Sequence, residues 1–190
     1  LEKLVRGLKM KKVTYNVSDE SILDKIFEFL VNNGLENAHI RDICRGTGIA
    51  MGSLYYWFGD KKTMIYETTV FGAKRVMNEV FGSVCEHTDL FADCESVIRR
   101  NRKYLCFIYQ MVASPVYGEQ MRDIRKSYDS LFNKYAEQLS VIYNCSKDIT
   151  YPIVLLYISA ILDYAVWEEK EKLESQVEYI YQLLLKEKGW

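Results

Sequence analysis

The spacing of glycines among apolar residues most strongly constrains the first 81 residues of this chain. In "SDESILDKIFEFLVNNG", apolar residues recur at i, i+3, i+4 and i+7, which marks one face of a helix, and Gly34 ends the pattern. Gly46 and Gly48, and then Gly59, limit the next two helical segments to about two turns each. Asp60 is expected to cap a longer helix that runs to Phe81. The pattern therefore predicts one medium, two short and one long helix in series.

Two short helices joined by a tight glycine turn form a helix-turn-helix pattern. In "AMGSLYYWF" the spacing predicts an inward stripe of Met51, Leu54, Tyr55 and Phe58. Tyr56 and Trp57 would then face outward or sideways, while the small Gly52 and Ser53 would let the helix start approach another surface closely. One interpretation makes that surface the major groove of DNA. The other is a small helical hairpin with an exposed aromatic edge, and spacing alone does not choose between them.

Beyond residue 83 the helical patterns become longer. They predict helices over about 90–115, 116–144, 150–167 and 168–189. The sequence contains two prolines, and Pro152 is expected in the first turn of its helix, where proline is tolerated. We therefore predict an all-α chain. It would consist of a basic N-terminal arm (1–17), a three-helix helix-turn-helix DNA-binding domain (18–64) and a C-terminal helical ligand-binding and dimerisation domain (65–190).

The net charge of −1 points to neither nucleic acid nor membrane. Residues 1–17 carry five basic groups and one acid, which suits either an arm along DNA phosphates or a solvated tail. "MKK" at Met10 also resembles a translation start, so the sequence leaves open whether residues 1–9 are native.

We expect a cytoplasmic protein without a membrane partner. The sequence shows no signal-peptide pattern, and no apolar run approaches the roughly 18 residues of a membrane span. The nearest run, "YPIVLLYISAILDYAVW", opens at Pro152 and is interrupted by Asp163. The five cysteines are odd in number and irregularly spaced, which is typical of a reducing compartment.

From Ile22 to about Tyr66, the sequence resembles the DNA-binding region of the TetR family of one-component transcriptional regulators. The family pattern "G[YF]xxT[ST][VM]xxIAxxAGVSxGTxYxxFxxKxxL" aligns without a gap to "GLENAHIRDICRGTGIAMGSLYYWFGDKKTM". The matching positions are Gly34, Ile40, Ile43, Gly48, Ile49, Gly52, Tyr55, Phe58 and Lys61. The rest of the chain is similar to the family only as an all-helical domain of suitable length.

The resemblance implies a homodimer whose helix-turn-helix modules enter successive major grooves of a palindromic operator. The recognition helix would be about Met51–Phe58, with Tyr55 packed inward while its hydroxyl reaches a phosphate. Tyr56 would face the groove, and Lys61 would bind phosphate. The predicted DNA-binding residues are His39, Arg41, Met51, Gly52, Ser53, Tyr55, Tyr56 and Lys61.

Several positions depart from the family pattern. Ala38 and His39 replace the preferred Thr and Ser, so a hydroxyl contact to phosphate is lost or replaced by imidazole. Ala50 replaces the usual serine cap, a change that costs about 1 kcal/mol at a helix start. Met51 occupies an often basic position. We therefore expect DNA binding to depend on the two lysines after Asp60 and on the N-terminal arm.

The sequence gives no support for an enzyme or for a cofactor, because it has two histidines and neither a Ser-His-Asp pattern nor a Gly-rich phosphate loop. One alternative is a metal- or thiol-redox-sensing regulator on the same scaffold. "CEHTDLFADC" offers Cys85, His87, Asp89 and Cys94 as zinc-type ligands, although their spacing is not a recurring metal motif, and we predict no metal site. A further alternative is a helical interaction protein without DNA binding.

Aromatic residues recur at helical spacing in the C-terminal domain. Such stripes are more typical of core than of pocket, but tyrosine brings a hydroxyl that leucine would not, so we interpret them as a pocket for a small apolar or aromatic effector. The candidate ligand-binding residues are Tyr104, Phe107, Met111, Tyr128, Phe132, Tyr135 and Asp163, of which Asp163 could instead cap a helix or face water.

The resemblance also implies a four-helix dimer interface built by the last two helices. The residues predicted there are Tyr157, Ile161, Tyr164, Val177, Ile180, Tyr181 and Leu184. The sequence therefore predicts a ligand-responsive regulator, more often a repressor in this family. Effector binding would shift the helix after Asp60 and change the separation of two DNA-reading modules set about 34–36 Å apart.

Overall fold

The computed structural model describes residues 17–86 and 94–187, without the side chains of 17–19, 82–86, 118–120, 122–127 and 187. Within these ranges it contains eight α-helices and no strand. They are α1 (Val17–Asn33), α2 (Ile40–Thr47), α3 (Met51–Phe58), α4 (Lys61–Glu86), α5 (Cys94–Ala113), α6 (Gly118–Tyr143), α7 (Lys147–Trp167) and α8 (Lys170–Glu187). The prediction of an all-α fold is confirmed.

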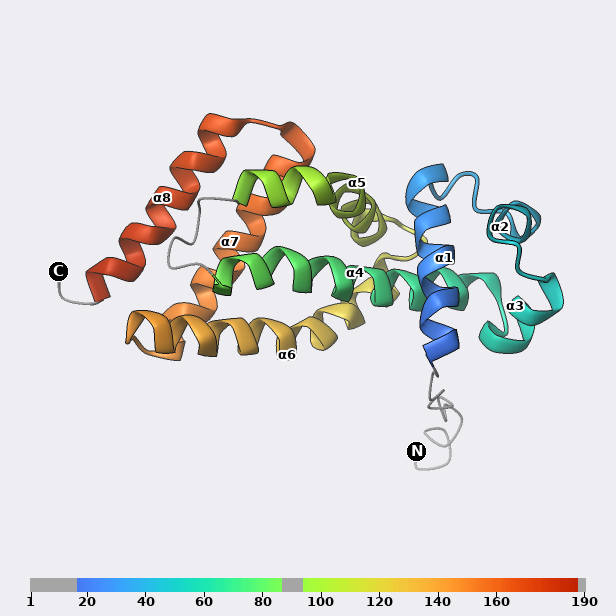
Figure 1. Cartoon of the computed structure of the whole chain (residues 1–190), viewed down its shortest axis with the longest axis horizontal. Coiled ribbons are helices and arrows are strands. Elements are labelled where there is room, and N and C mark those ends of the chain that lie inside the picture. Colours follow the sequence, from blue (N-terminus) through green and yellow to red (C-terminus); the bar gives the residue numbers. More distant parts are fainter. Residues whose placement is uncertain (1–16, 87–93, 188–190) are drawn as a thin grey trace, which may run out of the picture.

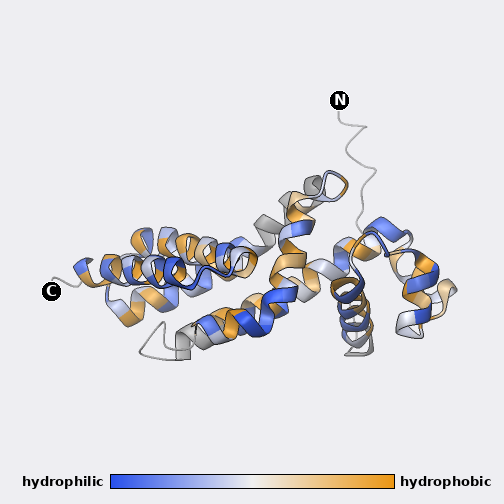
Figure 2. Cartoon of the chain, turned by 90° about the horizontal axis from the view of Figure 1, so that it is seen from above, coloured by the Kyte–Doolittle hydropathy of each residue, from blue (hydrophilic) through white to orange (hydrophobic). Residues whose placement is uncertain are grey.

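Helix α4 joins the two ends of the molecule (Figure 1). Its N-terminal part packs with α1, α2 and α3 into what we call the head, and its C-terminal part packs with α5–α8 into the body. The predicted domain boundary after residue 64 falls in the first turn of α4, so this one helix belongs to both parts. Hydrophilic and hydrophobic residues alternate along most helices, as packing on shared cores requires (Figure 2).

The glycines of the head divide its helices almost as predicted. Gly34, Gly48 and Gly59 all have positive φ, so each takes a backbone conformation that favours glycine. Gly46, however, lies inside α2 and does not end it. A Cβ there would come closer than 3.0 Å to two atoms of the Phe29 ring, so close packing of α2 on α1, not helix termination, explains this glycine.

Asp60 caps α4 as the sequence predicts. Its Oδ1 accepts a hydrogen bond from the Thr63 backbone N–H at 2.8 Å, and the Thr63 hydroxyl donates to Oδ2 at 3.0 Å. The hydrogen bond from the Thr63 backbone is the main reason why the pKa of Asp60 lies below its ordinary value. The cap fixes the direction in which α4 leaves the head.

Helix α7 begins earlier than predicted. Ser146 caps it by accepting a hydrogen bond from the Asp148 backbone at 3.2 Å, so the helix starts at Lys147 and Pro152 lies inside it, beyond the first turn. Among the described residues, α7 is also the one helix long and apolar enough to cross a membrane by length and composition. It packs against α5, α6 and α8, and a central core helix needs the same composition.

Helix α1 crosses α4 where Gly72 faces the ring of Phe27. A Cβ on Gly72 would lie closer than 3.0 Å to three atoms of that ring, and Phe27 is completely buried. The ring is held on its other sides by Tyr104, stacked at 5.8 Å between centroids, and by Phe107, edge-on at 6.0 Å. The missing side chain of Gly72 therefore sets how closely the head approaches the rest of the molecule.

We expect Gly72→Ala to lower the free energy of unfolding by about 1–3 kcal/mol, because overpacking a rigid site outweighs the helix preference of alanine. Gly52→Ala is the matched control, since nothing lies within 4 Å of a Cβ at that helical position. Denaturant unfolding of both variants measures the difference. Phe27→Leu in the Gly72→Ala background should recover part of the loss, and an unaffected Gly72→Ala protein would show that the two helices are not tightly packed there.

Candidate nucleic-acid interface

Helices α2 and α3 are held together by a short turn and a small core. Gly48 takes a left-handed conformation, and its N–H donates to the Cys44 carbonyl at 2.9 Å, which closes α2. The Thr47 hydroxyl donates to the Ile43 carbonyl at 2.6 Å. Ile43 and Leu54 are fully buried beneath the turn. This arrangement fixes the angle of α3 and leaves its opposite face in solvent.

The exposed face of α3 is aromatic and thioether-rich. Tyr56 is 86% exposed, Tyr55 47% and Met51 40%. The outward direction of Tyr56 is thus confirmed, whereas the inward packing expected for Met51 and Tyr55 is wrong. Leu54 and Phe58 are the buried residues of α3, and Trp57 packs partly buried against the same core.

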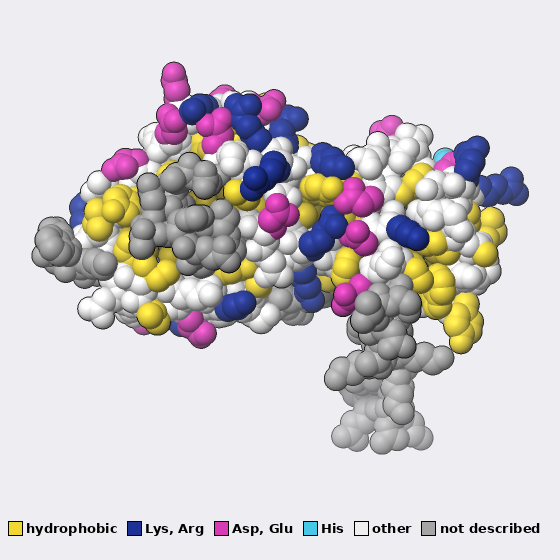
Figure 3. Space-filling view, in the orientation of Figure 1, with side chains coloured by type: hydrophobic (Ala, Val, Ile, Leu, Met, Phe, Trp, Pro, Cys, Tyr) yellow, Lys and Arg dark blue, Asp and Glu magenta, His cyan; other side chains and the backbone are white. Residues whose placement is uncertain are grey.

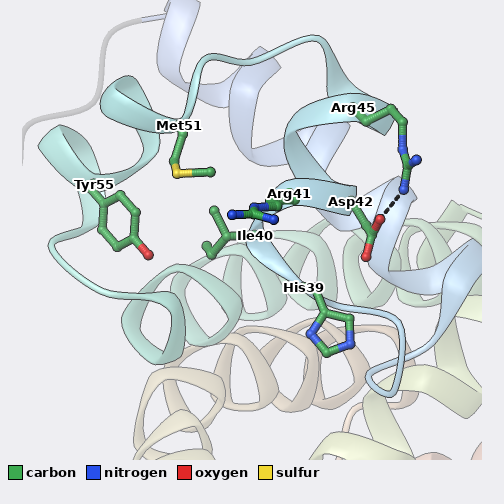
Figure 4. A pocket seen from close by; sticks show the side chains of 7 residues that line it. All are labelled: His39, Ile40, Arg41, Asp42, Arg45, Met51 and Tyr55. Atoms are coloured by element: carbon green, nitrogen blue, oxygen red, sulfur yellow. Dashed lines mark hydrogen bonds and ion pairs between the residues drawn. The ribbon is translucent and has the colours of Figure 1, made fainter.

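Between α2 and α3 lies an open hollow of about 700 Å³ (Figure 4). Met51 and Tyr55 of α3 face Ile40 and Arg41 of α2 across it, and His39 lies at the N-terminal end of α2. The hollow is lined by His39, Ile40, Arg41, Asp42, Arg45, Met51 and Tyr55. Four predicted DNA-binding residues, His39, Arg41, Met51 and Tyr55, therefore line one concave surface.

The remaining predicted residues surround that surface. Gly52 is exposed next to Met51, and Tyr56 is exposed on the same helix but is not among the residues that line the hollow. Ser53 is half-buried, and Lys61 is half-buried in the first turn of α4, outside the residues that line the hollow.

Sequence reasoning missed Arg45. It lies four residues after Arg41, on the same side of α2, and its side chain is 80% exposed and ion-paired with Asp42 (Figure 4). The i, i+4 spacing of the two arginines was the available signal. Basic side chains lie at this end of the molecule next to hydrophobic ones, and others lie along the body (Figure 3). The surface therefore combines a basic α2 with an uncharged α3.

A polar cluster around Glu28 links the head to the body. Its carboxylate accepts hydrogen bonds from the Tyr104 hydroxyl at 2.7 Å and from Arg75 at 2.9 Å, and Lys103 lies 3.4 Å away. Burial raises the pKa of Glu28, but these three partners together bring it below its ordinary value. Arg75 also pairs with Asp24. Helices α1, α4 and α5 thus meet at one charged carboxylate.

The predicted ligand-binding residues do not line one site. Tyr104 and Phe107 contact Phe27 in the α1–α5 contact. Met111 is fully buried on α5, whereas Tyr128, Phe132 and Tyr135 lie on α6, where the last two pack near Phe81 of α4. Asp163 forms an ion pair with Lys172 at 2.8 Å, so the negative charge of its carboxylate is already balanced within the protein. A single pocket lined by all seven residues is therefore excluded.

One hydroxyl among these residues has no visible partner. The Tyr128 side chain is buried and stacks on Phe132 at 5.7 Å, but its hydroxyl has no hydrogen-bond partner among the described residues. Burial and the neighbouring Tyr66 raise the pKa of Tyr128. An orphaned buried hydroxyl is costly, and a bound polar group would relieve that cost.

Most of the residues expected at a dimer interface are instead buried inside the single chain. Only Tyr181 is partly exposed. The other six, which are buried, are Tyr157, Ile161, Tyr164, Val177, Ile180 and Leu184. Their prediction as interface residues is wrong, because the apolar stripes of α7 and α8 pack against their own chain.

The thiol or metal cluster considered as an alternative lies mostly outside the described residues. This applies to His87, Asp89 and the side chain of Cys85. Cys94 is buried, accepts a hydrogen bond from the Tyr157 hydroxyl at 3.2 Å, and has its pKa raised by burial, which disfavours a reactive thiolate. In the described part of the chain, no group of three or more His, Cys, Asp or Glu residues could hold a metal ion.

Comparison with known proteins gives structural neighbours but no sequence relatives. No protein-family model and no curated protein matches the chain. A protein of Rhodococcus sp. RHA1 assigned as a transcriptional regulator superposes with a TM-score of 0.62 at 14% identity, over 88% of this chain and 95% of that one. The TetR family repressor AlkX from Dietzia sp. strain DQ12-45-1b, implicated in biodegradation of n-alkanes, gives 0.55 at 14% identity, over 88% and 97%.

A TetR-like transcriptional regulator from Rhodococcus sp. RHA1 gives a TM-score of 0.54 at 13% identity, covering 92% of this chain and 97% of that one. The similarity extends over the body as well as the head. The chain therefore has the TetR-type fold, an N-terminal helix-turn-helix head on an all-α body.

Proposed function

We propose that the protein is a transcriptional regulator of the TetR type that binds DNA through α2 and α3. The observation that carries this proposal is the exposed α2–α3 surface, on which Arg41 and Arg45 line one hollow with Met51 and Tyr55, while Tyr56 of the same helix α3 is 86% exposed. An α-helix fits the major groove of B-DNA. In this arrangement α3 enters the groove, while α2 crosses the backbone and its arginines contact phosphates.

The proposed partner in DNA binding is a second copy of the chain, docked on α7 and α8. Leu156, Ser159, Asp163 and Trp167 recur on one side of α7, where Leu156 and Trp167 are exposed. Asp163 pairs with Lys172 of α8, so this side adjoins the α8 side that carries the exposed Tyr179. This surface, which carries the exposed Leu156, Trp167 and Tyr179 together with the Asp163–Lys172 ion pair, replaces the buried residues first expected at the interface, because exposed hydrophobic side chains that cluster mark interaction sites.

The proposed effector site lies between α4 and α6, next to Tyr128. Its unpartnered hydroxyl would donate to a ligand whose remaining surface is apolar or aromatic, to match Phe132 and Tyr135. Because α4 also carries Arg75 and starts beside α3, a ligand that displaces α4 would move the head. The effector must bind the displaced state more tightly for this to release DNA.

The test is selection of duplexes from a random pool with the full-length protein. We expect enrichment of an inverted repeat bound by an even number of chains, with sedimentation showing the stoichiometry. Leu156→Arg should yield monomers and lose the inverted-repeat preference, whereas Val141→Arg, at an 81% exposed position on α6, should not. Failure to enrich any duplex would contradict the proposal and favour a helical interaction module.

A further inference from the structure

The exposed face of α3 lacks the side chains that recognise guanine or adenine by paired hydrogen bonds. From Met51 to Phe58 the sequence contains no Arg, Lys, Asn, Gln, Asp or Glu. Bidentate recognition uses Arg or Lys for guanine and Asn or Gln for adenine. The side chains that α3 does project belong to Met51, Tyr55 and Tyr56. A tyrosine hydroxyl makes single hydrogen bonds, and a thioether is only a weak acceptor.

These side chains are suited to a different feature of the major groove. The C5-methyl group of thymine is its one apolar marker, and apolar side chains recognise it by contact. Tyr56 has the largest exposed fraction of the three, 86%, and Met51 lies in the first turn of α3. Gly52 between them has open space where a Cβ would be, so the backbone can approach the base edges.

The charged residues near α3 are placed to contact phosphates and not bases. Arg41 and Arg45 are on α2, and Arg45 is paired with Asp42. On the proposed docking, α2 crosses the sugar–phosphate backbone, so its arginines meet phosphates and carry little base information. Discrimination between bases then falls to α3.

We propose that α3 reads its operator through thymine methyl groups, contacted by Met51 and Tyr56. This inference rests on the proposed DNA binding. It adds a prediction about the operator, namely that thymines occupy the positions of each half-site that face α3.

The test begins from the duplex enriched by selection and replaces its thymines, one at a time, by uracil, which lacks the methyl group and pairs identically. At the thymines facing α3, loss of one buried methyl should weaken binding about fourfold, as roughly 0.8 kcal/mol per buried CH₂ implies. Thymines elsewhere in the duplex should tolerate uracil, and they serve as internal controls.

Variants then assign the contacts. In Tyr56→Ala the uracil penalty should vanish at one thymine per half-site, whereas Tyr56→Phe, which keeps the ring, should retain it. Met51→Ala should remove the penalty at another thymine. An enriched duplex that binds equally well with every thymine replaced would overturn this inference alone. A protein that enriches no duplex would overturn the proposed function, and the inference with it.

Discussion

Replacing Phe81 by alanine is expected to lower the free energy of unfolding by about 3–5 kcal/mol, the largest effect we predict for a single substitution. Phe81 is 2% exposed and packs from α4 against α6 and α7. Its ring stacks on Tyr135 with centroids 4.3 Å apart and meets Tyr157 edge-on at 5.6 Å. Removing it loses both the buried area and these aromatic contacts, and leaves a cavity.

Denaturant titration of wild type, Phe81→Ala, Phe81→Leu and Tyr109→Ala measures this effect. Tyr109 is about half exposed, so Tyr109→Ala should hardly change the free energy of unfolding. Phe81→Leu should cause a loss between those of the two alanine variants, and it replaces Phe81→Ala in the test if that variant does not fold. Benzene should raise the Tm of Phe81→Ala by more than it raises that of wild type, because the new apolar cavity admits it. A loss of less than about 1 kcal/mol would show that this region is already hollow.

The head follows closely from local sequence. The stripe in α1, the cap at Asp60 and the stops at Gly34, Gly48 and Gly59 all depend on residues within one or two turns of each other. Such features are encoded by spacing and by backbone preference. The spacing predicts an inward Tyr55, whereas the side chain is 47% exposed, because spacing shows which residues share a helix face but not how much of that face the neighbouring helices cover.

The body shows what spacing cannot decide. The stripe from Val177 to Leu184 was correctly recognised as apolar, but apolar spacing does not distinguish packing on the same chain from packing on a second copy. Asp163 looked like a ligand contact until its ion pair with Lys172 was visible. The Glu28 cluster joins residues about 75 positions apart, so no local pattern could reveal it.

Loss of Arg41 is expected to have the largest effect on DNA binding. Arg41 is exposed on the surface shared with Met51 and Tyr55, and in a dimer each substitution removes one phosphate contact at both half-sites. Two lost charge-assisted hydrogen bonds, at about 1.5–3 kcal/mol each, imply a decrease in affinity of about 100- to 10,000-fold. The free energy of unfolding should change little, because an exposed side chain contributes little to folding.

Lys134→Ala provides the matched control, since it removes an exposed basic residue from α6, in the body. Both substitutions change exposed side chains, so we expect circular dichroism and thermal melts to coincide with those of wild type. Differences in DNA affinity between them then report the position of the charge and not the net charge of the protein.

The most direct test of DNA binding by the α2–α3 surface is the salt dependence of affinity for the selected duplex, measured by fluorescence anisotropy. Plotted as log K against log salt concentration, the slope for Arg41→Ala should be shallower than that of wild type by roughly two, one contact per half-site, while Lys134→Ala should match wild type. Equal affinity and equal slope for wild type and Arg41→Ala would contradict the assignment of DNA binding to this surface.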